Sequence, residues 1–323
     1  PGSGIYLMQQ HYTWNGPLNL ERLAEAWGRV IDRHPILRTA YVWKDLKRPL
    51  QVVRRRIDLA EAVHVLDWRG SSAAEQKDRL IRTLDSELAE GFDMGRAPLM
   101  RIRLIRTGEE SYHIVRSFHH ILTDDWCFSI LMMEVLSYYE ALLEGRSIDL
   151  PSPRPYRDYI AWLQRQDLGA AETFWRKELE GFSAPTSLGV ERLSSARQEA
   201  VSEVGDEFGE LSEHATVHLT TIAQQQGLTL NTFLQGAWAL LLSRYSGSDD
   251  IVMGVTVAGR PTELEGVESI VGLFINSLPL RVRITSSAPV LGWLKGLLAD
   301  NYGIGRYEYL PRVQIQQGSG IPK

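Results

Sequence analysis

Apolar residues recur at helical spacing near the start of the chain. Asn19, a residue that often caps helix N-termini, precedes the recurrence, and Pro35 ends it. The apolar positions are Leu20, Leu23, Ala24, Trp27, Val30 and Ile31. Spacings of three and four residues place these side chains on one face of a helix, so the pattern predicts an amphipathic helix ending near Pro35.

Alternation of apolar and polar residues predicts strands further along. Apolar and basic residues alternate over residues 100 to 104, a turn follows at Thr107 to Glu110, and a second strand at 112 to 118 completes a hairpin that leads directly into His119 and His120. The pattern also predicts strands at 38 to 43 and 50 to 55, a helix at 73 to 90, and a mostly buried helix at 125 to 144.

Three prolines between residues 147 and 155 and the loop at 181 to 185 interrupt this organisation, so we place a boundary between two lobes near 165 to 185. The expected lobes are residues 1–170 and 171–323. The elements predicted in the second half are helices at 212 to 226, 230 to 245 and 290 to 299, and strands at 250 to 257 and 278 to 284. The expected fold class is mixed α/β (α+β).

Composition indicates a soluble globular protein. The 323 residues include 35 Lys and Arg against 40 Asp and Glu, a formal net charge of −5, which argues against a nucleic-acid binder that neutralises phosphates. The longest apolar run, 236 to 242, is far shorter than a membrane span, so no membrane partner is expected. The single cysteine, Cys127, excludes an intrachain disulfide and favours a reducing cytoplasm. A chain beginning at Pro1 without a leader is interpreted as a piece of a longer polypeptide.

The strongest candidate for chemistry is the pair His119 and His120, followed by Asp124 and Asp125. Strand neighbours face opposite sides, so one histidine at most points into a given cleft. Two interpretations stay open from these residues alone: a functional histidine, or a core histidine followed by a helix whose N-terminus is capped by Thr123 or Asp124.

Metal binding and hydrolase chemistry are disfavoured, and no metal is expected. Adjacent histidines seldom bind one ion, and no Cys-x-x-Cys accompanies them. His214 and His218 share a helix spacing but lack the glutamate of zinc proteases. No Gly-x-Ser-x-Gly turn is present, and Cys127 lies within an apolar helix.

Five motifs in order resemble those of condensation domains of nonribosomal peptide synthetases. Residues 33 to 39 (RHPILRT) resemble the RHxxLRT motif, and residues 119 to 126 (HHILTDDW) resemble HHxxxDGW. The other three are residues 156 to 162, residues 259 to 281 with GRP and VGLFINSLPLR, and residues 307 to 311. Tyr156, Tyr159 and Trp162 also fit an ordinary core stripe.

The resemblance implies two lobes similar to chloramphenicol acetyltransferase, arranged in a V as a pseudo-dimer around a central tunnel. It implies that His120 is the catalytic residue in the tunnel and that Asp124 is structural and pairs with an arginine, for which Arg38 and Arg260 are the candidates. His119, Asp125 and Trp126 are expected to support the active site, and Asn276 and Ser277 to line the tunnel.

The implied activity is amide-bond formation between a donor aminoacyl or peptidyl thioester and an acceptor amino acid, as in antibiotic or siderophore biosynthesis. Both substrates arrive on phosphopantetheine arms of carrier proteins, with an adenylation domain adjacent and no covalently bound cofactor. A free amine has a pKa of about 7.7 to 8.0, so neutralising it at pH 7 costs only about 1 kcal/mol. Positioning of the amine by His120 is therefore favoured over proton removal, which stays open.

Asp125 stands where the family has glycine, adding a Cβ and a negative charge. An alternative is therefore a catalytically impaired module that binds a carrier protein or tailoring enzyme. The family's opening and closing motifs are lacking. Residues 3 to 6 and 33 to 36 resemble the subclass that accepts a donor ending in a D-residue.

Overall fold

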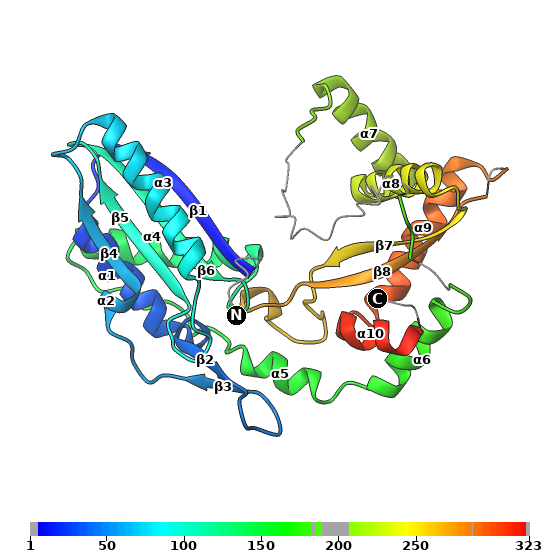
Figure 1. The fold of residues 1–323 in the computed structure, drawn as a ribbon, viewed down its shortest axis with the longest axis horizontal. Helices are drawn as coiled ribbons and strands as arrows, with labels where there is room; N and C mark the ends of the chain where they lie inside the picture. Colours follow the sequence, from blue (N-terminus) through cyan, green and yellow to red (C-terminus); the bar gives the residue numbers. More distant parts are fainter. Residues whose placement is uncertain (1–5, 183–184, 189–206, 286, 321–323) are drawn as a thin grey trace, which may run out of the picture. The chain divides into compact units, whose positions relative to one another are not determined.

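The computed structural model describes residues 6–182, 185–188, 207–285 and 287–320 (Figure 1). Contacts divide the chain into two compact units. Unit 1 comprises residues 1–165 together with 260–274, and unit 2 comprises residues 166–259 together with 275–323. The segment 260–274, which lies late in the sequence, therefore packs with the first unit.

Unit 1 is built on a four-stranded sheet with the order β1-β6-β5-β4. These strands span Leu7–Asn15 (β1), Val63–Asp67 (β4), Met100–Arg106 (β5) and Ser111–His119 (β6). The hairpin β5–β6 is antiparallel, as its alternating pattern predicts, and β1 adds an antiparallel edge strand while β4 joins in parallel.

Helices cover both faces of this sheet. α1 (Leu20–Arg33) and α4 (Asp125–Leu143) pack on one face, where β6 contributes Tyr112 and Phe118 to the core. α3 (Ala73–Glu90) packs on the other face, where Leu80 contacts Ile105 and Val115. Side chains of successive strand residues alternate between these two layers.

Helix α4 is long and apolar enough to span a membrane by length and composition alone. Its residues Leu131 and Val135 nevertheless lie in the core of unit 1 together with Trp27 and Val30 of α1. These contacts are those of a core helix of a globular unit, a kind of helix that passes the same length and hydropathy test.

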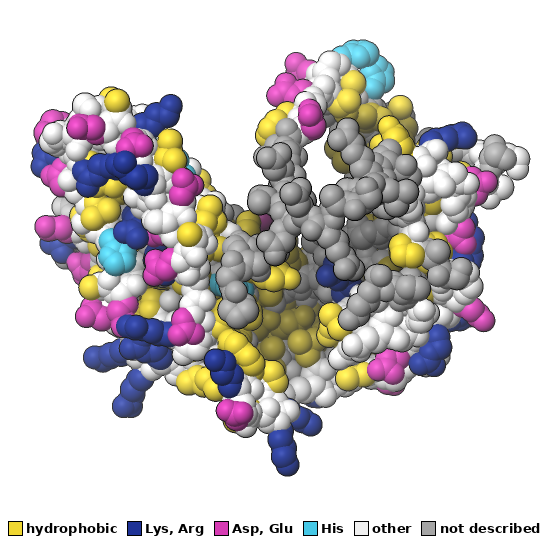
Figure 2. Space-filling view, viewed as in Figure 1, with side chains coloured by type: hydrophobic (Ala, Val, Ile, Leu, Met, Phe, Trp, Pro, Cys, Tyr) yellow, Lys and Arg dark blue, Asp and Glu magenta, His cyan; other side chains and the backbone are white. Residues whose placement is uncertain are grey.

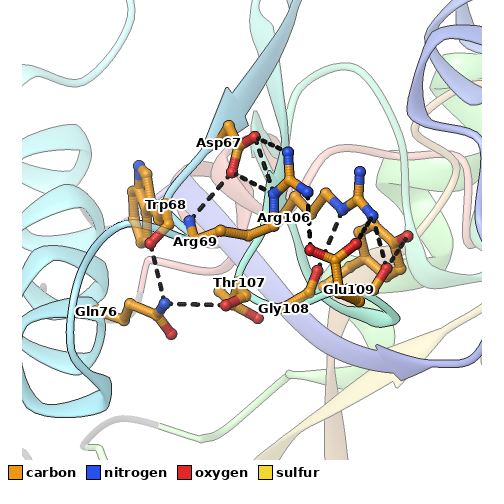
Figure 3. A network of polar contacts seen from close by, with 9 residues as sticks. Asp67, Trp68, Arg69, Gln76, Arg106, Thr107, Gly108 and Glu109 are labelled. Carbon is orange, nitrogen blue, oxygen red and sulfur yellow. Dashed lines mark hydrogen bonds and ion pairs between the residues drawn. The ribbon is translucent and has the colours of Figure 1, made fainter.

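The end of the sheet formed by the β5–β6 turn is held by a polar network (Figure 3). Arg69 binds the carboxylates of Asp67 and Glu109, and Arg106 also binds Glu109. The Gln76 amide donates to the carbonyls of Trp68, Ser71 and Thr107. Hydrogen bonds from Arg69 lower the pKa of Asp67 to about 2.

Shorter elements complete unit 1. A 3-10 turn (Pro35–Arg38) leads into a two-stranded ribbon of β2 (Thr39–Val42) and β3 (Leu50–Val53). α2 (Leu59–Ala62), α5 (Arg157–Leu163) and a 3-10 turn at Val267–Ser269 follow.

In unit 2, helices pack against the antiparallel pair β7 (Asp250–Val257) and β8 (Asn276–Arg283). The helices are α6 (Leu168–Glu178), α7 (Glu213–Gln226), α8 (Leu230–Ser246), α9 (Val290–Gly305) and α10 (Arg312–Ser319). Arg281 is buried and forms a bidentate ion pair with Asp250, at 2.6 and 2.8 Å, which lowers the pKa of that carboxyl.

On the face seen in Figure 2, Lys and Arg groups are interspersed with Asp and Glu groups. This mixture agrees with the small net charge. The expected helices and strands are confirmed, with small shifts at their ends. The patterns did not predict β1, β4 or α10. The lobe boundary at residues 170 and 171 stays a prediction.

Candidate functional site

The histidine pair lies where β6 ends and before α4 begins. His119 is the last residue of β6, and its backbone N–H donates to Leu99 O. His120 follows the strand, and its N–H donates to Tyr6 O. A short turn then brings the chain to Asp125, the first residue of α4.

His119 has a structural role that is visible in its contacts. Its Nδ1 accepts a hydrogen bond of 3.1 Å from the backbone N–H of Ile121, and its ring lies 6.0 Å from the Tyr6 ring. Burial, together with the neighbouring His120, lowers the pKa of His119. The neutral ring therefore holds the turn between strand and helix, with Nδ1 unprotonated.

His120 differs from His119 in how its ring nitrogen is used. The residue is half-buried, and its Nδ1 is buried without a hydrogen-bond partner among the residues that the structure describes. Buried polar atoms are normally paired, so an unpaired ring nitrogen is a group available to a bound molecule.

Asp124 is the N-cap of α4 and the centre of a buried cluster. Its Oδ1 accepts from the backbone N–H of Cys127 at 3.3 Å, and its Oδ2 accepts from the N–H of Phe274 at 3.0 Å. The same carboxylate lies 3.3 Å from Nη2 of Arg260, and both side chains are at most 5% exposed. A buried charge needs such partners, and Asp124 has them from two distant parts of the chain.

Arg260 spans this cluster. Its Nη1 donates to the carbonyls of Val267 and Ile270, at 2.7 and 2.9 Å. Its guanidinium lies 4.0 Å from the centre of the Phe274 ring and 5.2 Å from that of Trp126. Arg260 thereby joins the segment 260–274 to the start of α4.

Arg38, the other candidate partner of Asp124, has a different role. Its guanidinium donates to the backbone carbonyls of Ile31, Asp32, Arg54 and Arg55. It therefore holds the end of α1 to the chain after β3, and the pairing with Asp124 belongs to Arg260.

The first residues of the RHxxLRT motif bind α4. Arg33 and His34 contact the two carboxylate oxygens of Glu134 at 3.0 and 2.6 Å. Burial raises the pKa of Glu134, but hydrogen bonds from His34 and Arg33 outweigh this effect and lower the pKa overall. The interpretation of Arg33 and Arg38 as plain surface charges is wrong, because both are tied to buried partners.

Cys127 belongs to the same cluster as Asp124. Its Sγ lies 3.1 Å from Asp124 Oδ1 and 3.1 Å from Gly272 O. Burial, reinforced by the Asp124 charge, raises the pKa of the thiol to about 11. The thiol is thus a packed, protonated group.

Gly272 is required by its neighbour. A Cβ at this position would lie 2.0 Å from a ring carbon of Tyr156. The Tyr156 hydroxyl donates to Leu273 O, and its ring packs against Tyr159 and Phe274. The aromatic residues of the YxDYxxW segment therefore form core against the segment 260–274.

Asp125 and Trp126 are exposed beside this buried cluster. Asp125 occupies the first turn of α4, and Asp45 is the one non-glycine residue with positive φ in the described part of the chain. The backbone at Asp125 therefore suits a non-glycine residue. Trp126 is 53% exposed, and its Nε1–H donates to Glu268 O at 2.9 Å.

Asn276 and Ser277 lie at the start of β8 in unit 2. The Asn276 amide donates to the carbonyls of Glu308 and Leu310, at 2.8 and 2.9 Å, and its Oδ1 accepts from Ser277 N–H. Asn276 therefore holds the turn before α10, whereas Ser277 is exposed. The tunnel-lining role of both residues stays a prediction.

The histidines at 214 and 218 lie 4.5 Å apart between ring centres on α7. Within the described ranges, no group of three or more His, Cys, Asp or Glu residues is arranged to hold a metal ion. A cleft of about 710 Å³ opens at the opposite end of the β6 strand from His120, lined in part by Asp67, Arg106 and Glu109. Those charged groups are paired with one another or with Arg69.

One charged residue near this site was not singled out by the sequence analysis. Arg116 interrupts the otherwise apolar face of β6 formed by Tyr112, Ile114 and Phe118. Its position within an alternating strand is a signal that sequence reasoning could have used.

Comparison with known proteins identifies the family. The Condensation domain model matches residues 1–323. The linear gramicidin synthase of Brevibacillus parabrevis includes a protein that is 41% identical over the whole chain, and surfactin synthase subunit 3 of Bacillus subtilis (strain 168) is 36% identical. The chain spans 6% and 25% of the lengths of these two relatives.

Solved structures agree in fold. The first condensation domain of the calcium-dependent antibiotic synthetase, in complex with a substrate analogue, matches with a TM-score of 0.76 at 18% identity, covering 99% of this chain and 74% of that chain. The X-domain from teicoplanin biosynthesis matches with a TM-score of 0.79 at 22% identity, covering 98% and 70%.

The chain therefore belongs to the condensation-domain family. Condensation domains of nonribosomal peptide synthetases catalyse amide-bond formation by acyl or peptidyl transfer, so this is a family of enzymes. The family resemblance and the mixed α/β, chloramphenicol acetyltransferase-like fold class are confirmed. The V-shaped arrangement and the tunnel stay predictions.

Proposed function

We propose that this chain joins two carrier-bound substrates: it transfers a donor aminoacyl or peptidyl group from its thioester to the amine of an acceptor amino acid. The C–S bond of the donor breaks, a C–N bond forms, and the amine proton leaves with the carrier thiol as the other product. Phosphopantetheine arms of donor and acceptor carrier proteins deliver the substrates, and an adenylation domain adjacent in the same synthetase loads the acceptor carrier.

The observation that supports this proposal is the contrast between the two histidines. His119 uses Nδ1 to hold Ile121 N–H, whereas His120 Nδ1 has no partner among the described residues. An imidazole nitrogen can accept a hydrogen bond from a neutral amine or donate one, depending on its tautomer. We assign His120 to the attacking amine.

The role favoured for His120 is positioning. Neutralising an α-amino group at pH 7 costs about 1 kcal/mol, while correct orientation of two reactants contributes roughly 7 to 11 kcal/mol. A hydrogen bond from the amine to His120 restricts the amine to attack on the donor carbonyl. Proton removal by the same nitrogen is the second role, and it contributes roughly 10²- to 10⁴-fold in rate.

The buried cluster around Asp124 supports the site from below. It fixes the first turn of α4, and with it the turn that carries His120, through contacts to Arg260 and Phe274. In this proposal Asp124 acts on folding and geometry and does not contact substrate.

The catalytically impaired alternative has no observation in its favour. Asp125 motivated it, but this residue is exposed and has an ordinary helical position. The donor configuration belongs to the same proposal: residues 33 to 36 resemble the subclass that accepts a D-residue, while residues 3 to 5 lie outside the described residues. The protonated thiol of Cys127 is consistent with the reducing cytoplasm in which we place the reaction.

The test is reconstitution with purified carriers. The donor carrier is loaded with a peptide ending in an L- or a D-residue, the acceptor carrier with a single amino acid, and the acceptor arm is analysed by mass spectrometry. An acceptor arm heavier by the donor acyl group supports the proposal, and a higher rate with the D-ending donor supports the subclass. Unchanged acceptor arms with either donor would reject the proposed function.

A further inference from the structure

Arg116 is a buried cation in the middle of β6. Its residue is 3% exposed, and its guanidinium lies 4.0 Å from the centre of the Phe118 ring and 5.4 Å from that of Phe128. Among the described residues, Nε and Nη1 of Arg116 are buried without an acceptor within hydrogen-bond distance. Two donors of a charged group are thus directed into the protein with nothing to bind, which is costly in a folded protein.

Gln10 faces Arg116 from the neighbouring strand. The two residues are direct cross-strand partners of β1 and β6, so their side chains point to the same side of the sheet. Gln10 Oε1 is also buried without a hydrogen-bond partner among the described residues. The sheet face therefore carries unsatisfied donors and an unsatisfied acceptor side by side.

This polar pair lies on the route to His120. Residues 116, 118 and 120 alternate with 117 and 119, so Arg116 and His120 belong to the same side of the extended chain. Four residues of strand correspond to about 13 Å between their Cα atoms. Arg116 is therefore too remote to contact the reacting carbonyl, and it can instead contact a group several bonds away along the same substrate.

The chemistry of the pair indicates what it binds. Arginine donors accept a carbonyl or carboxylate oxygen as partner, but a carboxylate would leave Gln10 Oε1 facing another acceptor. A secondary amide satisfies both sides, because its C=O accepts from Arg116 and its N–H donates to Gln10. Burial lowers the pKa of Arg116 to about 10, and the negative charge of Asp125 is among the effects that oppose this shift, so the group is a cation at neutral pH.

We propose that Gln10 and Arg116 form a binding site for a secondary amide of the carrier-bound substrate, on the sheet face that leads to His120. The inference rests on the proposed function, because the amide belongs either to the pantetheine arm or to the donor peptide. Arg116 is a binding residue in this account, remote from the bond that forms.

The test compares Arg116→Met with the wild type in both stability and turnover. Replacing a buried, unpaired cation with an apolar residue of similar length leaves the melting temperature unchanged or raises it. The same substitution lowers kcat/KM for amide formation at least ten-fold, because the substrate amide loses its donor. Gln10→Leu is expected to lower kcat/KM in the same direction.

Arg101→Met is the matched control. Arg101 lies on the adjacent strand β5 and also has a buried Nη1 without a described partner, but it pairs with Ser117 and faces the α3 side. Its loss should leave kcat/KM within about two-fold. Unchanged kcat/KM in Arg116→Met would overturn the inference and would indicate that buried water alone satisfies the guanidinium. A fall matched by Arg101→Met, or explained by a lower melting temperature, would also overturn it.

Two probes identify the source of the amide, and both are used in binding assays that need no turnover. S-acetyl-pantetheine carries only the amides of the arm, and a tripeptide ethyl thioester carries only peptide amides. Weaker binding of the first probe alone to Arg116→Met assigns the arm, and weaker binding of the second alone assigns the donor peptide. Equal binding of both probes to variant and wild type overturns the inference.

The binding assay also separates this inference from the proposed function. If the wild type forms no amide but binds a probe that Arg116→Met binds at least ten-fold more weakly, the proposed function fails and the site stands. If the wild type turns over normally while Arg116→Met matches it in turnover and binding, the site fails and the proposed function stands.

Discussion

The carboxylate of Asp124 lies 3.3 Å from Nη2 of Arg260, although 136 positions separate the two residues in the chain. This contact links the N-terminus of α4 to the segment 260–274. Because Asp124 also caps α4, one carboxylate connects the local start of a helix with the long-range packing of unit 1.

Asp124→Ala is expected to destabilise the protein by about 3 to 5 kcal/mol, because it leaves Arg260 buried without its partner. Asp124→Asn should cost less, since the amide oxygen can still cap the helix. The matched control is Asp125→Ala, which removes an exposed carboxylate next in the chain and should cost at most about 1 kcal/mol. Urea unfolding measures all three. Equal effects of the Asp124 and Asp125 substitutions would show that the ion pair contributes little.

Gly272→Ala tests the packing of the segment 260–274 against α5. A Cβ would lie 2.0 Å from the Tyr156 ring, so the ring or the backbone must move, at a cost of about 3 kcal/mol. At Gly254, in β7, an added Cβ meets nothing within 4 Å, so Gly254→Ala is the control and should be neutral or slightly stabilising. Similar melting temperatures for both variants would contradict the account of Tyr156.

Cys127 provides a direct report on the integrity of the buried cluster. With its pKa near 11, roughly 0.1% of the thiol is ionised at pH 8, and its burial blocks access. Native protein should therefore resist alkylation by iodoacetamide for hours, while protein in urea should take up one label per chain, since Cys127 is the single cysteine. Rapid labelling of native protein, read by mass spectrometry, would mean that the cluster opens readily.

His119 predicts a specific dependence of stability on pH. Its pKa is lower in the folded chain, so its neutral form stabilises the fold fully above the ordinary value of 6.5. That stability is lost as the pH falls below 6.5 and the ring must be protonated at Nδ1, where it accepts from Ile121 N–H.

His119→Asn removes this titration but keeps a side-chain acceptor near the Nδ1 position. The free energy of unfolding of wild type minus variant should decrease between pH 7.5 and pH 5. Measuring the difference cancels the other histidines whose pKa is lowered, His11, His64 and His113. A difference that is constant over this range would remove His119 from the account.

Most helices and strands of this fold could be predicted because their signals are local. Asn19 and the stripe from Leu20 to Ile31 specify α1, and alternation specifies the β5–β6 hairpin. β1 has no such signal: apart from Leu7 and Met8, its residues are mainly polar or exposed, as suits an edge strand beside β6.

The candidate site was predictable only in part. The spacing of His119, His120 and Asp124 identifies the turn, but a sequence gives no information on which arginine reaches Asp124. Arg38 lies at the end of α1 and finds backbone carbonyls nearby, whereas Arg260 depends on the return of a distant segment to unit 1. Gln10 and Arg116 become a pair only through the register of β1 on β6.

The central claim is that His120, and not His119, acts on the attacking amine. The measurement is the single-turnover rate of amide formation between saturating loaded donor and acceptor carriers, for the wild type, His120→Ala, His120→Gln and His119→Asn. Melting temperatures and affinities for the carriers are measured alongside, so that a folding or docking defect is recognised.

We predict a loss of about 10²-fold or more for His120→Ala, with unchanged carrier affinity and an unchanged melting temperature. A smaller loss for His120→Gln, which retains a hydrogen-bonding side chain, would favour positioning over proton removal. His119→Asn should stay within a few-fold of the wild type. Amide formation by His120→Ala at the wild-type rate would contradict the account.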